Sequence, residues 1–119
     1  MKSKSTNPQL IQLIKILRKK SRENNAKIWK DIAKRLAKPR RKSITVNLSR
    51  LNRYTDKNET VVVPGKVLGA GRLNHPINVA AFSFSKKAEE KITAVKGKPL
   101  SILQLAKKNP KGSKIKIIG

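Results

Sequence analysis

Six basic side chains stand within nine residues of the sequence, and they form the densest group in the chain that could do chemistry. A guanidinium group presents its N–H donors as a planar fork that matches two phosphate oxygens, and an ammonium group adds a compact positive charge. The pattern predicts a segment that grips phosphate groups, and the alternative is a basic turn in solvent. The six residues are Lys34, Arg35, Lys38, Arg40, Arg41 and Lys42.

The positive charge extends over the whole chain. Lys and Arg number 30 against 6 Asp and Glu, a net charge of +24 over 119 residues. Because so much like charge repels itself in a compact domain, a partner is expected to supply anions, and nucleic acid is the usual polyanion. Residues 1–57 hold 18 basic and 3 acidic side chains, and residues 58–119 hold 12 and 3. Both halves are therefore expected to touch the partner. No apolar run approaches the ~18 residues of a membrane span.

Groups that could catalyse a reaction are scarce. The chain has no cysteine, and its one histidine, His75, stands before a proline in a segment typical of a loop. A nuclease metal site needs a cluster of carboxylates, and the six acids form no obvious pair. Asp31 and the Glu89–Glu90 pair fit better as salt-bridge partners of basic neighbours in helices. We therefore expect a protein that is not an enzyme, with no cofactor, no metal and no small-molecule substrate.

A glycine-rich segment, residues 64–72, follows a β-branched run and invites comparison with nucleotide-binding loops. It contains neither G-x-x-x-x-G-K-[ST] nor G-x-G-x-x-G, so both of those motifs are excluded. Lys66 and Arg72 flank its glycines. Glycine permits tight bends and close approach of the backbone to a ligand, so the segment is either a contact for a nucleic-acid backbone or a plain turn.

The four aromatic residues bear on the kind of nucleic acid. Trp29, Tyr54, Phe82 and Phe84 all fall in apolar stripes, so we interpret all four as core. Proteins that bind single strands stack bases on several exposed aromatic rings. Their shortage here favours folded, double-helical RNA or DNA, recognised by shape and phosphate contacts.

The first half of the chain is predicted to be helical. Residues 1–6 form a basic tail, and Asn7 followed by Pro8 is typical of a helix start. That helix gives way to a connection at residues 23–25, and a second helix covers residues 26–37. A third, at 47–54, should turn Tyr54 inward and carry Arg50 and Arg53 on an exposed flank.

The second half mixes strands and helices. Strands are expected at 60–63 and 77–84, with Pro64-Gly65 turning the chain after the first. Helices follow at 86–95, capped by Ser85 and ended by Gly97, and from Ser101 to Asn109. Residues 113–118 alternate as a half-buried strand with Lys114 pointing outward. The pattern gives an α/β class, with one domain over residues 7–119 and a helical region at about 7–55.

Several of these segments resemble one family. The stretches 29–33, 35–36, 38–41, 46–48 and 59–69, the last reading ETVVVPGKVLG, are similar to the archaeal and eukaryotic large-subunit ribosomal protein numbered eighteen, the "e" type. The resemblance spans nearly the whole chain, and the compact length resembles the archaeal form. It implies an α/β fold of irregular ββα turns after an N-terminal helical region, shared with the C-terminal part of the bacterial large-subunit protein numbered fifteen.

The resemblance also implies a function and a site. It implies a non-catalytic structural protein of the cytoplasmic ribosome that binds large-subunit ribosomal RNA beside neighbouring ribosomal proteins. An archaeal chromatin or general DNA-binding protein is the alternative. By the resemblance, the RNA contacts include Lys38, Arg40, Arg41 and Lys66. Charge and expected exposure add Lys2, Lys4, Arg50, Arg53, Arg72 and Lys114.

Overall fold

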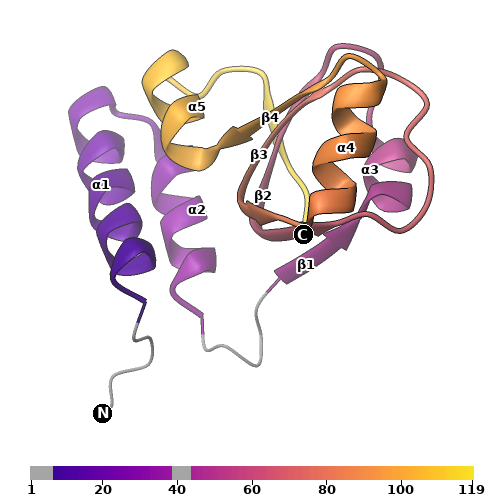
Figure 1. Ribbon diagram of the computed structural model, residues 1–119. Helices are drawn as coiled ribbons and strands as arrows, with labels where there is room; N and C mark the ends of the chain where they lie inside the picture. The colour runs from indigo at the N-terminus through magenta and orange to yellow at the C-terminus, as the bar shows by residue number, and fades with distance from the viewer. Residues whose placement is uncertain (1–6, 39–43) are drawn as a thin grey trace. The chain divides into compact units, whose positions relative to one another are not determined.

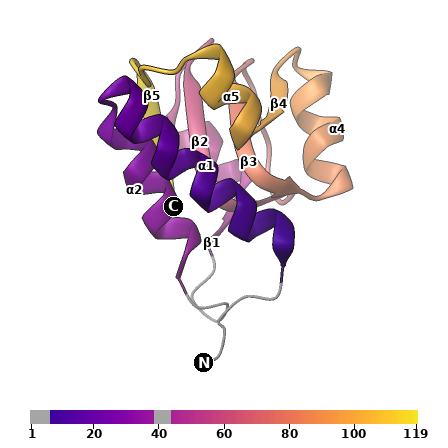
Figure 2. The same ribbon diagram turned by 90° about the vertical axis from the view of Figure 1, so that its left-hand side faces the viewer.

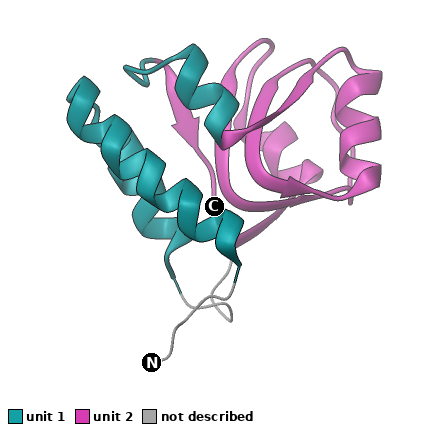
Figure 3. Ribbon diagram, turned by 60° about the vertical axis from the view of Figure 1, so that its left-hand side comes forward, with its two compact units in different colours: residues 1–43, 103–113 teal, residues 44–102, 114–119 magenta. Residues whose placement is uncertain are grey.

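The computed structural model describes residues 7–38 and 44–119, which divide into two compact units (Figure 3). The helical unit comprises residues 1–43 and 103–113, and the sheet unit comprises residues 44–102 and 114–119. Five helices and five strands occur in the described chain, which confirms the predicted α/β class.

The helical unit is built on two helices that lie side by side, α1 (Pro8–Asn24) and α2 (Lys27–Leu36) (Figures 1 and 2). The predicted cap at Asn7 is confirmed, because its Oδ1 accepts from the backbone N–H groups of Gln9 at 2.9 Å and Leu10 at 3.3 Å. The predicted connection at residues 23–25 is too long. Helix α1 continues to Asn24 and ends at Asn25, whose φ of 52° is a left-handed conformation that asparagine tolerates.

A buried tryptophan organises the helical unit. Trp29 is fully buried, and its indole Nε1 donates a hydrogen bond of 2.7 Å to the carbonyl oxygen of Pro110. This bond fixes the segment that follows α5 (Ile102–Lys108) against α2. The end of that helix before Asn109-Pro110 is confirmed. The other buried apolar residues of this unit include Leu13, Leu17, Ile32, Ala33, Leu36, Leu105 and Ala106.

The sheet unit contains a five-stranded sheet in which every pairing is parallel. Its strands are β1 (Ile44–Asn47), β2 (Thr60–Leu68), β3 (Asn78–Phe84), β4 (Lys98–Ser101) and β5 (Ile115–Ile117). The order is β1-β2-β3-β4. β5 also pairs with β2, along residues 60–62, while β1 pairs with its residues 65–68. The strands β1 and β4 were not expected from the sequence.

The connections between the parallel strands contribute residues to the core of the sheet unit. Parallel neighbours need a crossover connection, which is usually a helix. Helix α3 (Leu48–Tyr54) connects β1 to β2, and α4 (Lys86–Ala94) connects β3 to β4 (Figure 1). The segment 69–77 connects β2 to β3 without a helix. The resulting apolar cluster contains Val46, Leu48, Leu51, Val61, Val63, Val67, Leu73, Ile77, Val79, Ala81, Ala88, Ile92 and Ile118.

The prediction that Pro64-Gly65 turns the chain is wrong, because β2 runs through both residues. A β-bulge absorbs them: the pairing with β3 shifts between Val63 and Lys66, so that two residues of β2 oppose one of β3. Gly65 is required by the partner strand, since a Cβ there would lie 2.1 Å from the carbonyl oxygen of Ile44. This glycine therefore serves the close approach of β1.

The end of α4 differs in detail from the expectation. Ser85 caps its start as predicted, with Oγ accepting from the N–H of Ala88 at 3.1 Å. The residue that leaves the helix is Lys96, with a φ of 66°, and Gly97 is not the left-handed residue. A Cβ at Gly97 would lie 2.7 Å from the carbonyl oxygen of Ile77, so close backbone packing explains that glycine.

Candidate nucleic-acid interface

Five of the predicted site residues lie outside the described ranges: Lys2, Lys4, Arg40, Arg41 and Lys42. Three others stand at the C-terminal end of α2, where positive charge complements the helix dipole. Lys34 and Lys38 are exposed. Arg35 is partly engaged, because its Nε donates to Asp31 Oδ1 at 3.2 Å across one helical turn.

The sheet unit brings three predicted arginines onto adjoining segments. The backbone N–H of Ser49 in α3 donates to the carbonyl oxygen of Ala70 at 3.1 Å, and Asn52 Oδ1 accepts from the N–H of Asn74 at 3.0 Å. These bonds lay the crossover 69–77 along α3. Gly71 makes the approach possible, since it has a φ of 91° and a Cβ there would lie 2.4 Å from Ser49 Cβ. The arginine band that results consists of Arg50, Arg53 and Arg72, all exposed.

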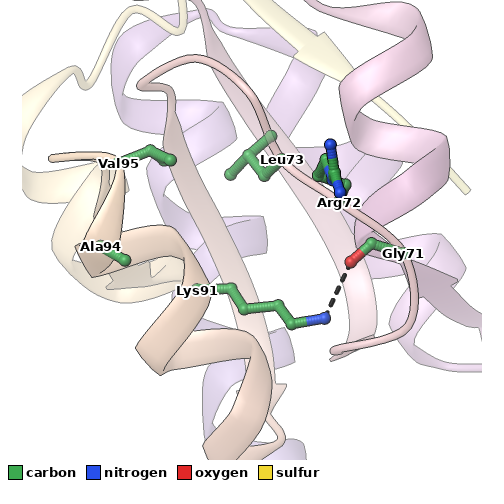
Figure 4. A pocket seen from close by; sticks show the side chains of 6 residues that line it. All are labelled: Gly71, Arg72, Leu73, Lys91, Ala94 and Val95. Atoms are coloured by element: carbon green, nitrogen blue, oxygen red, sulfur yellow. Dashed lines mark hydrogen bonds between the residues drawn. The ribbon is translucent and has the colours of Figure 1, made fainter.

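A lysine of α4 holds the same crossover in place. Lys91 Nζ donates to the carbonyl oxygens of Gly69 and Gly71, each at 2.8 Å, and Figure 4 shows the side chain reaching across to Gly71. Charge-assisted bonds of this kind are stronger than neutral ones. Lys91 therefore positions the backbone next to Arg72. Sequence reasoning missed this role, because acceptors on the main chain leave no trace in residue types.

An open hollow lies beside Arg72. It has a volume of about 460 Å³, and Leu73, Ala94 and Val95 give it a largely apolar lining (Figure 4). Gly71, Arg72 and Lys91 complete it. Because the Lys91 ammonium is already bonded to carbonyl oxygens, Arg72 is the cation at this hollow that remains for a partner.

Two further predicted contacts lie on other parts of the sheet unit. Lys66 is exposed on β2, where Thr45 of β1 and Ser83 of β3 are its register partners. Lys114 precedes β5 and is exposed, as predicted, with a φ of 58°. Neither belongs to the segments that form the arginine band.

The Glu59 carboxylate of the sheet unit accepts hydrogen bonds from other residues of the same unit. Glu59 Oε1 accepts from the Asp56 N–H at 2.7 Å and from Lys116 Nζ at 3.2 Å. The Asp56 N–H, and then Lys116, lower the pKa of Glu59 below its ordinary value of 4.5. The same Lys116 ammonium donates to the carbonyl oxygen of Tyr54 at 2.9 Å. Lys116 thus ties β5 to the end of α3.

His75 has a structural role. Its Nε2 lies 2.8 Å from Thr55 Oγ1, and that hydroxyl donates to the carbonyl oxygen of Leu51 at 2.6 Å. The hydroxyl proton is thereby used, so the histidine nitrogen is the donor to Thr55. Across the ranges 7–38 and 44–119, no three His, Cys, Asp or Glu residues gather where they could hold a metal ion. None of the described helices is long and apolar enough to cross a membrane.

The prediction that all four aromatics belong to the core is wrong for one of them. Trp29 is buried, and Phe82 and Phe84 are half-buried, but Tyr54 is 52% exposed. Successive steps of three residues fall about 60° short of a full helical turn, so Leu48 and Leu51 face the core while Tyr54 has rotated away from it. A prediction that places every third residue of a helix on the buried face therefore fails after two steps.

The same family is identified by comparison with known proteins. The family described as ribosomal protein 60S L18 and 50S L18e matches residues 1–119. The large ribosomal subunit protein eL18 of Methanoregula boonei is 52% identical over 113 residues, covering 95% of this chain and 93% of that protein. The eL18 protein of Archaeoglobus fulgidus is 48% identical over 115 residues, covering 97% and 98%. The chain therefore belongs to the family of ribosomal proteins 60S L18 and 50S L18e.

Proposed function

We propose that this chain is a structural, non-catalytic constituent of the large ribosomal subunit, and that it acts by binding folded large-subunit ribosomal RNA through phosphate contacts. Its relatives carry the name large ribosomal subunit protein, which supports this assembly, and we propose that the chain works there in the cytoplasm. The family consists of ribosomal proteins and is not a family of enzymes.

The observation that carries the RNA-binding mechanism is a set of exposed cations without partners on both units. In the parts of the chain that the structure describes, their side chains make no hydrogen bond or ion pair with other residues. A cation left unpaired in a chain of net charge +24 is available to neutralise phosphate. The set is Lys34, Lys38, Arg50, Arg53, Lys66, Arg72 and Lys114.

We propose that the predicted contacts outside the described ranges complete this interface. Lys2, Lys4 and the run Arg40 to Lys42 carry the same chemistry as the exposed cations of α2. Arg35 contributes less, because Asp31 already offsets its charge. The interface then extends over residues 7–119 as one RNA-binding domain, with the basic tail 1–6 and neighbouring ribosomal proteins beside it.

Salt dependence of binding tests this mechanism. The affinity of the full chain for large-subunit ribosomal RNA should fall steeply with salt, by about 0.7–0.9 in log K per unit of log salt for each phosphate neutralised. The triple variant R50Q/R53Q/R72Q should bind more weakly and with a shallower slope. Binding that hardly changes with salt would contradict the phosphate mechanism. Equal affinity for duplex DNA and for a folded ribosomal RNA fragment would favour the general DNA-binding alternative.

A further inference from the structure

Tyr54 is an aromatic side chain that the fold does not use. With 52% of its surface exposed, it is one of two large apolar side chains that stand out from the described parts of the chain, the other being Ile11. The phenol makes no hydrogen bond within those parts. A single exposed tyrosine is ordinary on a protein surface, so its surroundings decide whether it has a use.

The surroundings of Tyr54 are cationic. Arg50 stands one helical turn before it on α3, a spacing that makes the two side chains neighbours on the helix surface. Arg53 precedes it and Lys57 follows it, and all three cations are exposed and have no ion-pair partner in the described chain. Asp56 is the one acid of this segment. An exposed aromatic side chain with three exposed cations within four residues of it in the chain matches a nucleobase with its flanking phosphates, because rings stack on bases and guanidinium groups bind phosphate oxygens.

The backbone at Tyr54 is held from two directions. Lys116 Nζ donates to its carbonyl oxygen at 2.9 Å, which ties it to β5. The next residue, Thr55, is buried and bonded both to Leu51 O and to His75 Nε2. The end of α3 is therefore fixed before any partner arrives. A fixed platform loses little conformational entropy on binding, which favours affinity.

We propose that the Tyr54 ring is a stacking platform for one unpaired RNA base, with Arg50 and Arg53 binding the phosphates on either side of that base. The proposal rests on the RNA-binding function proposed above and deepens it. It adds recognition of a base that is bulged or looped out of the double helix to a surface otherwise built for phosphates. An apolar side chain of a protein partner would leave Arg50, Arg53 and Lys57 unmatched, so the charge favours RNA.

The test uses the full chain and two RNA hairpins that differ by a single unpaired adenosine in the stem. Stacking on an aromatic side chain is worth about 1–3 kcal/mol per base, so the chain should prefer the bulged hairpin by about 5- to 150-fold. Y54A should lose that preference and keep its affinity for the fully paired hairpin. Y54F should keep both, because the ring and not the hydroxyl carries the contact.

The fully paired hairpin controls for folding, because a damaged protein would lose affinity for both RNAs. Absence of a preference in the native chain, or a preference that survives Y54A, would overturn the platform. A chain that binds folded ribosomal RNA and shows no preference for the bulge would retain the proposed function and lose only this inference. A chain that binds no RNA would overturn both.

Discussion

The helical unit and the sheet unit use their positive charge in different ways. The helical unit carries 18 basic and 2 acidic residues among 54, a net charge of +16, and the sheet unit carries 12 and 4 among 65, a net charge of +8. In the described part of the helical unit, Lys19 and Arg35 pair with acids one helical turn away at the surface, Lys19 with Glu23 at 4.0 Å and Arg35 with Asp31 at 3.2 Å. Pairs of that kind contribute little to stability.

In the sheet unit, by contrast, two lysines hold the fold. Lys91 binds the carbonyl oxygens of Gly69 and Gly71, and Lys116 binds that of Tyr54 as well as the Glu59 carboxylate. The cations of this unit thus divide into those that position backbone and those that remain for a partner. Net charge alone therefore overstates the surface that is available to a partner, because some ammonium groups already have acceptors in the protein.

The largest expected effect concerns the backbone of the sheet unit. Gly65→Ala would place a methyl group 2.1 Å from the Ile44 carbonyl oxygen, where no flexible side chain can yield. We expect a loss of about 3 kcal/mol or more in the free energy of unfolding, from separation of β1 and β2. Urea unfolding measures the loss. Lys66→Ala, on the exposed side of the same strand, is the control, and a cost as large as that of Gly65→Ala would contradict the explanation.

The second effect separates a structural lysine from an ordinary one. Lys91→Met removes both bonds to the crossover 69–77, so it should cost about 1–3 kcal/mol in unfolding free energy and weaken RNA binding through Arg72. The matched control is Lys86→Met, which makes the same change at an exposed lysine of α4 without a bonded partner in the described chain. Similar unfolding curves for the two variants would show that Lys91 is not a tether.

Part of the fold could be predicted from the sequence, and part of it could not. Local signals were read well: Asn7 and Ser85 cap their helices, and the run Val61–Val63 is a strand buried on both faces. Their causes lie within a few residues of the chain. The strands β1 and β4 are four residues each and owe their existence to pairing with β2 and β3, which no local pattern reveals.

The candidate site also combines features that the local sequence predicts with features that depend on contacts between distant segments. Arg50, Arg53 and Arg72 were chosen for charge and expected exposure, but their arrangement depends on bonds from Ser49 to Ala70 and from Asn52 to Asn74. Those bonds join segments about twenty residues apart. Arg40 and Arg41 lie outside the described ranges and stay predictions, as does every RNA contact.

Two adjacent cations of α2 should contribute unequally to RNA binding. Lys34 and Arg35 are neighbours on α2, yet only Arg35 has an acidic partner. Lys34→Gln should weaken RNA binding and reduce the salt slope by about 1, whereas Arg35→Gln should change both less, because Asp31 already offsets that charge. Titrations at several salt concentrations give both slopes. A larger effect at Arg35 would mean that its ion pair opens on binding.

The smallest expected effect is the pH dependence of the contribution that the Glu59 carboxylate makes to stability. Its pKa is lowered in the folded chain by the Asp56 N–H and by Lys116, so the ionised form favours folding. This contribution is complete above the unfolded value of 4.5 and is lost as the pH falls through the lower folded value. Glu59→Gln should therefore unfold more easily than the native chain at neutral pH, and the difference should shrink in acid. Glu90→Gln, at an exposed glutamate of α4 that makes no hydrogen bond or ion pair in the described chain, is the matched control. If the difference in stability between Glu59→Gln and the native chain persisted unchanged at low pH, the charge of Glu59 would not be what ties β5 to α3. The loss would then come from an amide that fails to reproduce the hydrogen bonds of the carboxylate.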